Sequence, residues 1–147
     1  MPQTFTPRDP NYAERIRNSF YKQKAMQTIG ATLGEIKPGE VHVELPYSDH
    51  IVQQDGFLHA GIVTTIVDSA CGYAAFTLMP ANSRVLSIEF KVNLISPAVG
   101  ERFVAIGKVI KPGRTITVCS GEVFAFEGEE RKLVALMQAT MMRLERE

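Results

Sequence analysis

Asp68 is the only charged residue in a segment of 28 residues, from position 56 to position 83. Charged residues make up 22% of the chain, so a segment of that length would carry about six of them. A buried carboxylate without a partner costs several kcal/mol. No lysine or arginine stands three or four residues away, where a helix would bring it into contact. Asp68 is therefore a candidate catalytic carboxylate; the alternative is an aspartate that meets a partner from elsewhere in the fold or faces solvent.

The tripeptide His59-Ala60-Gly61 stands at the expected start of the helix that carries Asp68. Small residues there leave the first backbone N–H groups accessible, and such groups suit an anion or a developing oxyanion. His59 either orients a carbonyl group or caps the helix. The seven to nine residues between this tripeptide and Asp68 span about 10–14 Å of helix. The tripeptide and Asp68 of one helix therefore cannot both reach the same atom. If both act on one substrate, they come from different subunits.

Other catalytic and binding motifs are absent from the sequence. It has no GxSxG elbow, no GxGxxG fingerprint and no Walker A loop. His42, His50 and His59 lack the spacing of metal ligands, so no metal is expected. Cys71 and Cys119 stand among apolar residues and are expected to be inert.

The chain has 147 residues and a mass of 16.3 kDa, which suits one domain over residues 1–147. Its 16 basic and 16 acidic residues argue against a nucleic-acid partner and a polybasic membrane contact. The N-terminus has no apolar signal region, and the uncharged segment has too few large aliphatic residues to span a membrane. With two unpaired cysteines, a cytoplasmic protein is expected.

The periodicity of apolar residues predicts two helices, at about residues 11–26 and 60–78. Asp9 and Pro10 are expected to cap and begin the first. Six segments have strand patterns: residues 28–36, 40–45, 86–94, 102–110, 115–126 and 133–144. Most of the surface of the long helix is apolar or small, so it must be buried. An antiparallel sheet wrapped around one helix, an α+β architecture, satisfies these demands.

Two local features of the predicted strands bear on the candidate site. In residues 86–94, strict alternation would place Leu86, Ile88 and Phe90 on one face and Ser87 on the opposite, polar face. Residues 111–114 predict a hairpin turn with Gly113 at a positive φ.

The run QQDGFLHAG at residues 53–61, followed by Asp68 and then by Ser87-Ile88-Glu89, resembles the hotdog-fold acyl-CoA thioesterases. The similarity is greatest to the PaaI-type members of the 4-hydroxybenzoyl-CoA thioesterase superfamily, and it covers nearly all of the chain after Tyr12. It implies a hotdog fold: an antiparallel sheet of five to six strands around one long central helix, with a short N-terminal helix.

The resemblance also implies roles for individual residues. Asp68 matches the catalytic carboxylate, which acts as a general base for water or as a nucleophile. Ala60 matches the residue whose backbone N–H polarises the thioester carbonyl, and Ser87 matches a serine that orients water. His59 and Gly61 complete the motif, in which alanine replaces the more usual first glycine.

Gln53 occupies the position where related enzymes often have asparagine, which helps to hold substrate or water. Further residues match positions that contact substrate or CoA: Leu94, Ser96, Pro97, Lys111, Gly113, Arg114 and Thr115. Lys111 and Arg114 could meet the CoA phosphates, or could be ordinary charged residues of a turn.

The resemblance implies a homodimer with the active site at the interface, further assembled as a dimer of dimers. No separate cofactor is expected, because coenzyme A is part of the substrate. Two alternatives stay open: an acyl-CoA-binding hotdog protein without activity, and a hotdog dehydratase or hydratase. The acyl group is not predicted.

Overall fold

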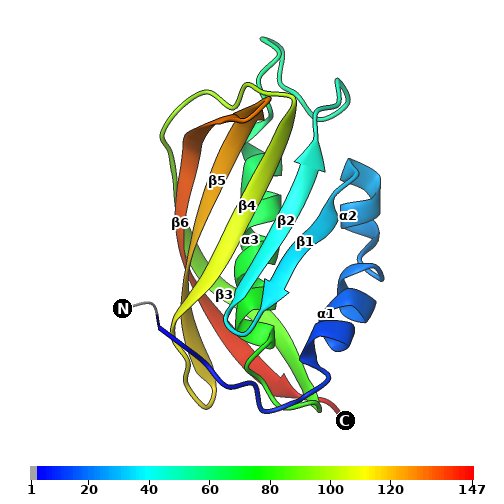
Figure 1. Cartoon of the computed structure of the whole chain (residues 1–147), viewed down its shortest axis with the longest axis vertical. Helices are drawn as coiled ribbons and strands as arrows, with labels where there is room; N and C mark the ends of the chain where they lie inside the picture. Colours follow the sequence, from blue (N-terminus) through cyan, green and yellow to red (C-terminus); the bar gives the residue numbers. More distant parts are fainter. Residues whose placement is uncertain (1–2) are drawn as a thin grey trace.

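The computed structural model describes residues 3–147 as a six-stranded antiparallel sheet that curves around one long helix (Figure 1). The strand order is β1-β2-β4-β5-β6-β3. The helices are α1 (Tyr12–Phe20), α2 (Lys24–Ile29) and α3 (Ala60–Phe76). The strands are β1 (Thr32–Lys37), β2 (Glu40–Pro46), β3 (Ser83–Leu94), β4 (Arg102–Lys111), β5 (Ile116–Glu127) and β6 (Glu130–Glu145). The α+β architecture predicted from the sequence is confirmed.

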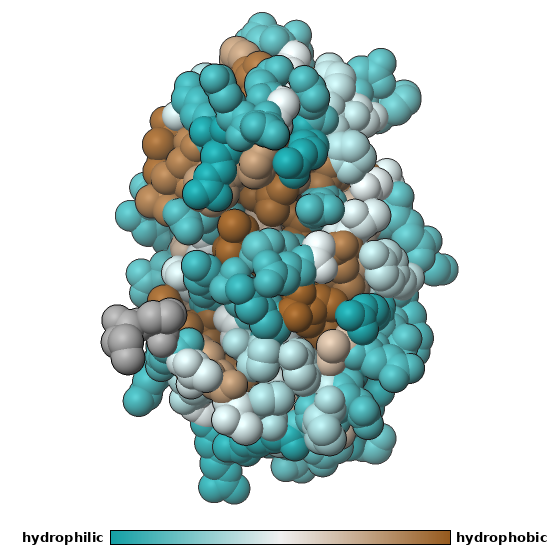
Figure 2. All heavy atoms as spheres, in the orientation of Figure 1, coloured by the Kyte–Doolittle hydropathy of each residue, from teal (hydrophilic) through white to brown (hydrophobic). Residues whose placement is uncertain are grey.

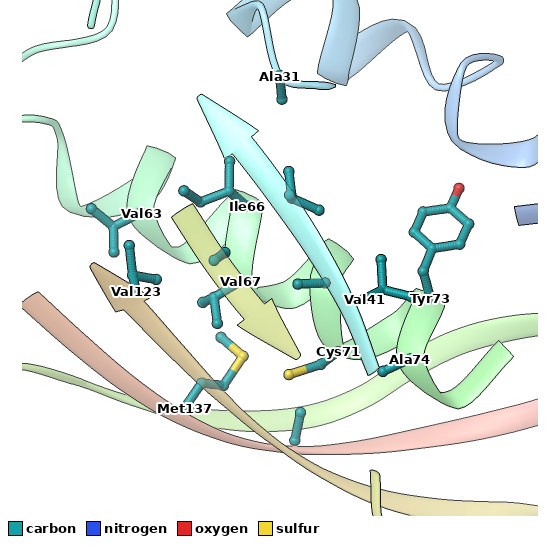
Figure 3. Packing of buried hydrophobic residues seen from close by; sticks show 14 of the residues in the cluster. Ala31, Val41, Val63, Ile66, Val67, Cys71, Tyr73, Ala74, Val123 and Met137 are labelled. Carbon is teal, nitrogen blue, oxygen red and sulfur yellow. The ribbon is translucent and has the colours of Figure 1, made fainter. Parts of the chain in front are cut away.

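Helix α3 packs directly on the middle of the sheet, and two glycines make this possible. Gly107 of β4 and Gly121 of β5 are paired across the sheet. A Cβ on Gly107 would collide with the backbone of Ala70, and one on Gly121 would collide with the side chain of Val67. The helix backbone therefore lies closer to the sheet than any side chain at position 107 would permit. Figure 3 shows the helix side chains packed against those of β5 and β6.

The N-terminal helix differs from the prediction of one helix over residues 11–26. It begins at Tyr12 rather than Pro10, and two separate helices are present. Helix α1 ends in a tight turn, in which Gln23 N–H bonds to the Phe20 carbonyl, and the Gln23 side chain then donates to Tyr73 of α3. Gly30, with a φ of 83°, ends α2 in the left-handed conformation. The first strand accordingly begins at Thr32, not at residue 28.

A β-bulge in β3 overturns the predicted alternation of its side chains. Ser87 pairs with Met141 and Glu89 with Thr140, so Ile88 is an extra residue without a partner. Beyond the bulge, Phe90 lies opposite Ala139 on the face that α3 covers. Directly opposite residues share a face. Ser87 therefore points toward the helix, on the same face as Phe90 and not on the face opposite to it.

Smaller differences concern the ends of elements. Helix α3 ends at Phe76, two residues before the predicted end, because Thr77 caps it and donates to the Ala74 carbonyl. Strand β3 begins at Ser83 rather than at residue 86. None of the helices in residues 3–147 is both long and apolar enough to cross a bilayer.

Candidate active site

Asp68 lies in the middle of α3 and is partly exposed, with Ser87 of β3 as its partner. The Ser87 hydroxyl donates to Asp68 Oδ1 over 2.6 Å and also lies 3.3 Å from Met141 Sδ. Among the described residues no cation forms an ion pair with Asp68. The partner from elsewhere in the fold is thus a neutral hydroxyl. This bond occupies Oδ1, and Oδ2 has no hydrogen-bond partner within residues 3–147.

The first turn of α3 leaves one backbone donor free. His59 Nδ1 accepts from the Gly61 N–H over 2.8 Å, and the His59 carbonyl accepts from Ile62 and Val63. No hydrogen bond among the described residues uses the N–H of Ala60, which is exposed. His59 is thus the cap of the helix, and its bond to Gly61 occupies the neighbouring donor. The helix dipole adds partial positive charge at this end. Ala60 is consequently suited to bind a carbonyl oxygen that gains negative charge.

Gln53 organises the loop that leads into α3. Its side-chain oxygen accepts from the N–H groups of Asp55, at 2.6 Å, and Phe57, at 3.0 Å. Its backbone N–H donates to the Phe57 carbonyl. Gly56 has a φ of 86°, which lets the loop turn back on itself. Gln53 therefore fixes the loop through its oxygen, and its amide NH2 group has no partner among the described residues.

The predicted site residues fall into three places in one chain. Asp68 and Ser87 line a groove of about 850 Å³ between α1, α3 and β3. A smaller pocket of about 280 Å³ lies at the start of α3. Its lining includes five predicted site residues: Gln53, Ala60, Leu94, Ser96 and Pro97. Ala60 and Asp68 stand eight residues apart on α3, about 12 Å along its axis. One chain alone does not bring the N–H of Ala60 and the carboxylate of Asp68 to one atom.

The third group of predicted site residues lies at the C-terminal end of α3. Gly113 and Arg114 of the β4–β5 hairpin line a pocket of about 290 Å³ together with Ala75 and Leu78. Gly113 does not have the predicted positive φ. Glycine is needed there because a Cβ would collide with the Ile116 carbonyl oxygen.

Two arginines that the sequence did not single out, Arg8 and Arg143, line the same pocket as Arg114. No motif marks Arg8, and Arg143 stands in a strand that alternation alone would treat as ordinary. Lys111 and Thr115 are exposed beside this pocket and do not line it.

The two cysteines are buried and inert, as predicted. Burial raises the pKa of the Cys71 thiol well above its ordinary value, and burial raises the pKa of Cys119 to about 12. Both thiols therefore stay protonated near neutral pH.

Potential metal ligands gather at one place among residues 3–147, on the β1–β2 hairpin. Glu35, Glu40 and His42 have ligand atoms within 4.8 Å of one another. The Lys37 ammonium lies 3.2 Å from Glu35, and Glu40 is 2.7 Å from His42 Nε2. The cluster lines none of the three pockets, so it has no part in the chemistry considered for Asp68.

Comparison with known proteins identifies the family. Residues 55–132 match the family described as Thioesterase superfamily. The chain belongs to the thioesterase superfamily. The matched part contains Ala60, Asp68 and Ser87, whereas Gln53 lies two residues before it.

Solved structures support this thioesterase assignment. A thioesterase family protein from Silicibacter pomeroyi is 50% identical, with a TM-score of 0.89, and the match covers 91% of this chain and 98% of that one. The PaaI protein of E. coli, from the phenylacetic acid degradation operon, is 16% identical with a TM-score of 0.81, over 92% of this chain and 96% of that one. The PaaI likeness bears on the fold alone. Together these structures confirm the hotdog fold of this thioesterase-superfamily chain.

Among curated proteins, a "Putative esterase" of Saccharolobus solfataricus is 32% identical over 94 residues, 64% of this chain and 66% of that protein. A "Putative esterase" of Halobacterium salinarum is 27% identical over 95 residues, 61% of this chain and 62% of that protein. In both cases this thioesterase-superfamily chain spans less than two thirds of its relative's length.

Proposed function

We propose that this protein hydrolyses acyl-CoA thioesters to a free carboxylate and coenzyme A. One observation carries the proposal: the free N–H of Ala60, at the start of the same helix that holds the Ser87-bonded carboxylate of Asp68. A thioester needs two things to be hydrolysed, a donor for the oxygen that becomes negative and a base for water. The two groups supply both.

The complete site is formed by two subunits. Strand β3 is an edge strand of 12 residues, and it exposes about half of Leu86, Ile88 and Leu94. Such a long apolar edge favours pairing with another strand. Antiparallel pairing of β3 with a second copy would place the two α3 helices side by side on the same face of a continuous sheet.

The spacing on α3 fits a two-fold axis at Thr64. Ala60 and Asp68 are each four residues from Thr64, and all three are at least partly exposed. In antiparallel helices related by such an axis, Ala60 of the partner subunit stands opposite Asp68. Ala60 and Asp68, which lie far apart within one chain, are thereby brought together across the interface.

In the reaction, the thioester oxygen accepts a hydrogen bond from the partner's Ala60. Asp68 takes a proton from water, whose oxygen attacks the carbonyl carbon. The C–S bond then breaks, and the CoA thiolate leaves and takes the proton. Ser87 holds Oδ1, so that Oδ2 is the atom free to act. Direct attack of Oδ2, which gives a mixed anhydride that water then hydrolyses, remains the alternative.

Residues beside Ala60 and at the far hairpin would hold coenzyme A. Leu94, Ser96 and Pro97 line the pocket at Ala60 and would contact the pantetheine part. Arg8, Arg114 and Arg143 line one pocket, whose lining includes no acidic residue. Guanidinium groups bind phosphate in this way, so this pocket suits the CoA phosphates.

A dimer of dimers would use the outer face of the sheet. Figure 2, in the orientation of Figure 1, shows apolar patches among polar side chains on this face, with α3 behind the sheet. Ile110, Ile116 and Leu136 are among the exposed apolar residues. Exposed apolar surface of this kind is typical of subunit contacts.

The two rival functions predict different results when the protein is incubated with an acyl-CoA. An acyl-CoA-binding protein without activity would bind saturably and release no thiol, and it would need neither Asp68 nor Ser87. A dehydratase or hydratase would interconvert a hydroxyacyl and an enoyl thioester, with no thiol released.

The proposal is tested by thiol release from a panel of acyl-CoAs. We expect release by the wild type and a loss of at least about 100-fold in Asp68→Asn, with the fold kept. Asp49→Asn, the same change at an exposed loop position, should keep wild-type rates. Full activity in a folded Asp68→Asn variant would show that Asp68 is not the base. Absence of thiol release by the wild type across the panel would contradict the function itself.

A further inference from the structure

The Ser87 hydroxyl has a second contact besides its bond to Asp68, and that contact is a sulfur atom. It lies 2.6 Å from Asp68 Oδ1 and 3.3 Å from Met141 Sδ. A serine hydroxyl has one proton to donate, and both of these atoms are acceptors. Among the described residues no other group is hydrogen-bonded to the Ser87 side chain. The orientation of the hydroxyl is therefore decided by these two neighbours.

The register of the sheet brings Met141 to Ser87. The two residues stand directly opposite each other on β6 and β3, immediately before the bulge at Ile88. Directly opposite residues point to the same face, with Cβ atoms about 4.5–5.5 Å apart. Met141 is fully buried, and a Cβ at Gly72 of α3 would meet no atom of the sheet other than Met141 Sδ, at 4.0 Å. The sulfur is thus enclosed between the helix and the sheet, next to the serine.

The two acceptors differ in strength, and the difference depends on the charge of Asp68. An ionised carboxylate is a much stronger acceptor than a thioether. The Ser87 proton therefore points to Asp68 while that residue is charged. In the proposed reaction Asp68 takes a proton from water and stays neutral until the thiolate leaves. A neutral carboxyl group accepts more weakly, and during that interval Met141 Sδ is a second acceptor within reach of the hydroxyl.

We propose that Met141 is a positioning residue for the reaction: its sulfur holds the Ser87 hydroxyl beside Asp68 while the carboxyl group is protonated. The bond to Oδ1 then forms again when the proton leaves. The inference rests on the proposed thioesterase function and assigns a role within that same site. Ser87 is exposed, so a hydroxyl without the sulfur would turn to water in another of its staggered positions. A thioether suits this role because it only accepts, and so does not compete with Ser87 as a donor to Asp68.

The test compares kcat and KM for thiol release in the wild type, Met141→Leu, Ser87→Ala and the double variant. Leucine keeps the volume of the side chain and removes the acceptor, an exchange that protein cores tolerate. We expect Met141→Leu to lower kcat by about three- to tenfold with KM unchanged, the effect of losing one neutral hydrogen bond. Added to Ser87→Ala, the same change should have no further effect, because the sulfur acts through Ser87.

Met137→Leu is the matched control. Met137 is also buried on β6 and lies opposite Gly121, on the face that α3 covers, but it makes no contact with Ser87. This variant should keep the wild-type kcat. Replacement of all six methionines by norleucine, in which CH2 takes the place of sulfur, repeats the test with the smallest change of shape. It should lower kcat in the wild type and leave Ser87→Ala unchanged, and it keeps the test valid if Met141→Leu does not fold.

Three results would overturn the inference. An unchanged kcat in both folded Met141→Leu and the norleucine protein would mean that Ser87 needs no sulfur, while leaving the thioesterase function intact. An equal loss in Met137→Leu, or a further loss when Met141→Leu is added to Ser87→Ala, would mean that Met141 serves packing alone. Absence of thiol release by the wild type with every acyl-CoA would remove the proposed function and the inference with it.

Discussion

Ser87 donates a hydrogen bond of 2.6 Å to Asp68, from a strand to a helix 19 residues earlier in the chain. The extra residue Ile88 is what turns this hydroxyl toward α3. Bulges often re-aim a side chain next to an active site. The bond fixes one carboxylate oxygen of Asp68 and leaves the other available.

Ser87→Ala should reduce kcat by about 10–100-fold, because a hydrogen bond to a charged group contributes about 1.5–3 kcal/mol. KM should change little, since the serine acts on the carboxylate. Steady-state kinetics of thiol release measure both. Ser120→Ala, at a half-buried serine of β5, is the matched control and should keep wild-type kinetics. An equal loss in both variants would point to a general disturbance of the sheet.

Ala60→Pro should reduce the rate by about 10²–10³-fold, the cost of removing one oxyanion donor. Proline is favoured at the first position of a helix, and His59 has a φ of −59° and a ψ of 136°, which suits a residue before proline. The change thus removes the N–H with little effect on the fold, which circular dichroism would check. Ala60→Gly keeps the N–H and should retain activity. If Ala60→Pro is as active as Ala60→Gly, the oxyanion donor lies elsewhere.

Gly107→Ala should lower the free energy of unfolding by about 1–3 kcal/mol, because the added Cβ meets the backbone of Ala70. Gly72→Ala should raise it instead, by about 0.5–1 kcal/mol. Denaturant unfolding of both variants measures the two signs. A stable Gly107→Ala protein would mean that α3 does not need the close approach to β4.

Burial of the cysteines predicts a loss of stability at high pH. The folded-state pKa of Cys119 is about 12 and that of Cys71 is raised well above its ordinary value, so both thiols bind protons more tightly when folded. Their contribution is complete below the unfolded pKa, about 8.5, and is lost as the pH rises toward the folded pKa. At pH 10 the loss from Cys119 is about 1–2 kcal/mol.

Urea unfolding between pH 7 and pH 10 measures this effect. Cys119→Ala should show a smaller fall in stability over that range than the wild type. Equal falls in the two proteins would contradict the assignment of the pH dependence to this thiol.

The sequence predicted the central helix because its periodicity is a local pattern. Asp68 stood out by the absence of other charges, whereas the role of Ala60 came from the family resemblance. The predicted orientation of the Ser87 side chain was wrong, because the alternation of residues in one strand does not reveal a bulge. It depends on the register with β6, which is a contact between residues far apart in the chain.

The N-terminal region and the pocket lined by Arg8, Arg114 and Arg143 show the same limit of prediction from local sequence. The break between α1 and α2 lies at the turn of Gln23, whose side chain bonds to Tyr73 of α3, and Gly30 was a local signal only for the end of α2. Arg8 and Arg143 meet Arg114 only after the strands have folded. Most of the assignment of roles came from the family resemblance, since residue patterns alone indicate a carboxylate without naming its reaction.

The central claim is that Asp68 of one subunit and Ala60 of the other act on one thioester, and subunit mixing tests it most directly. Asp68→Asn and Ala60→Pro proteins, each inactive alone, are unfolded together and refolded as an equal mixture. Half of the dimers then contain one subunit of each variant, and one of the two sites in such a dimer is intact. Thiol release should therefore return to about a quarter of the wild-type rate. A mixture as inactive as its components would contradict the shared site.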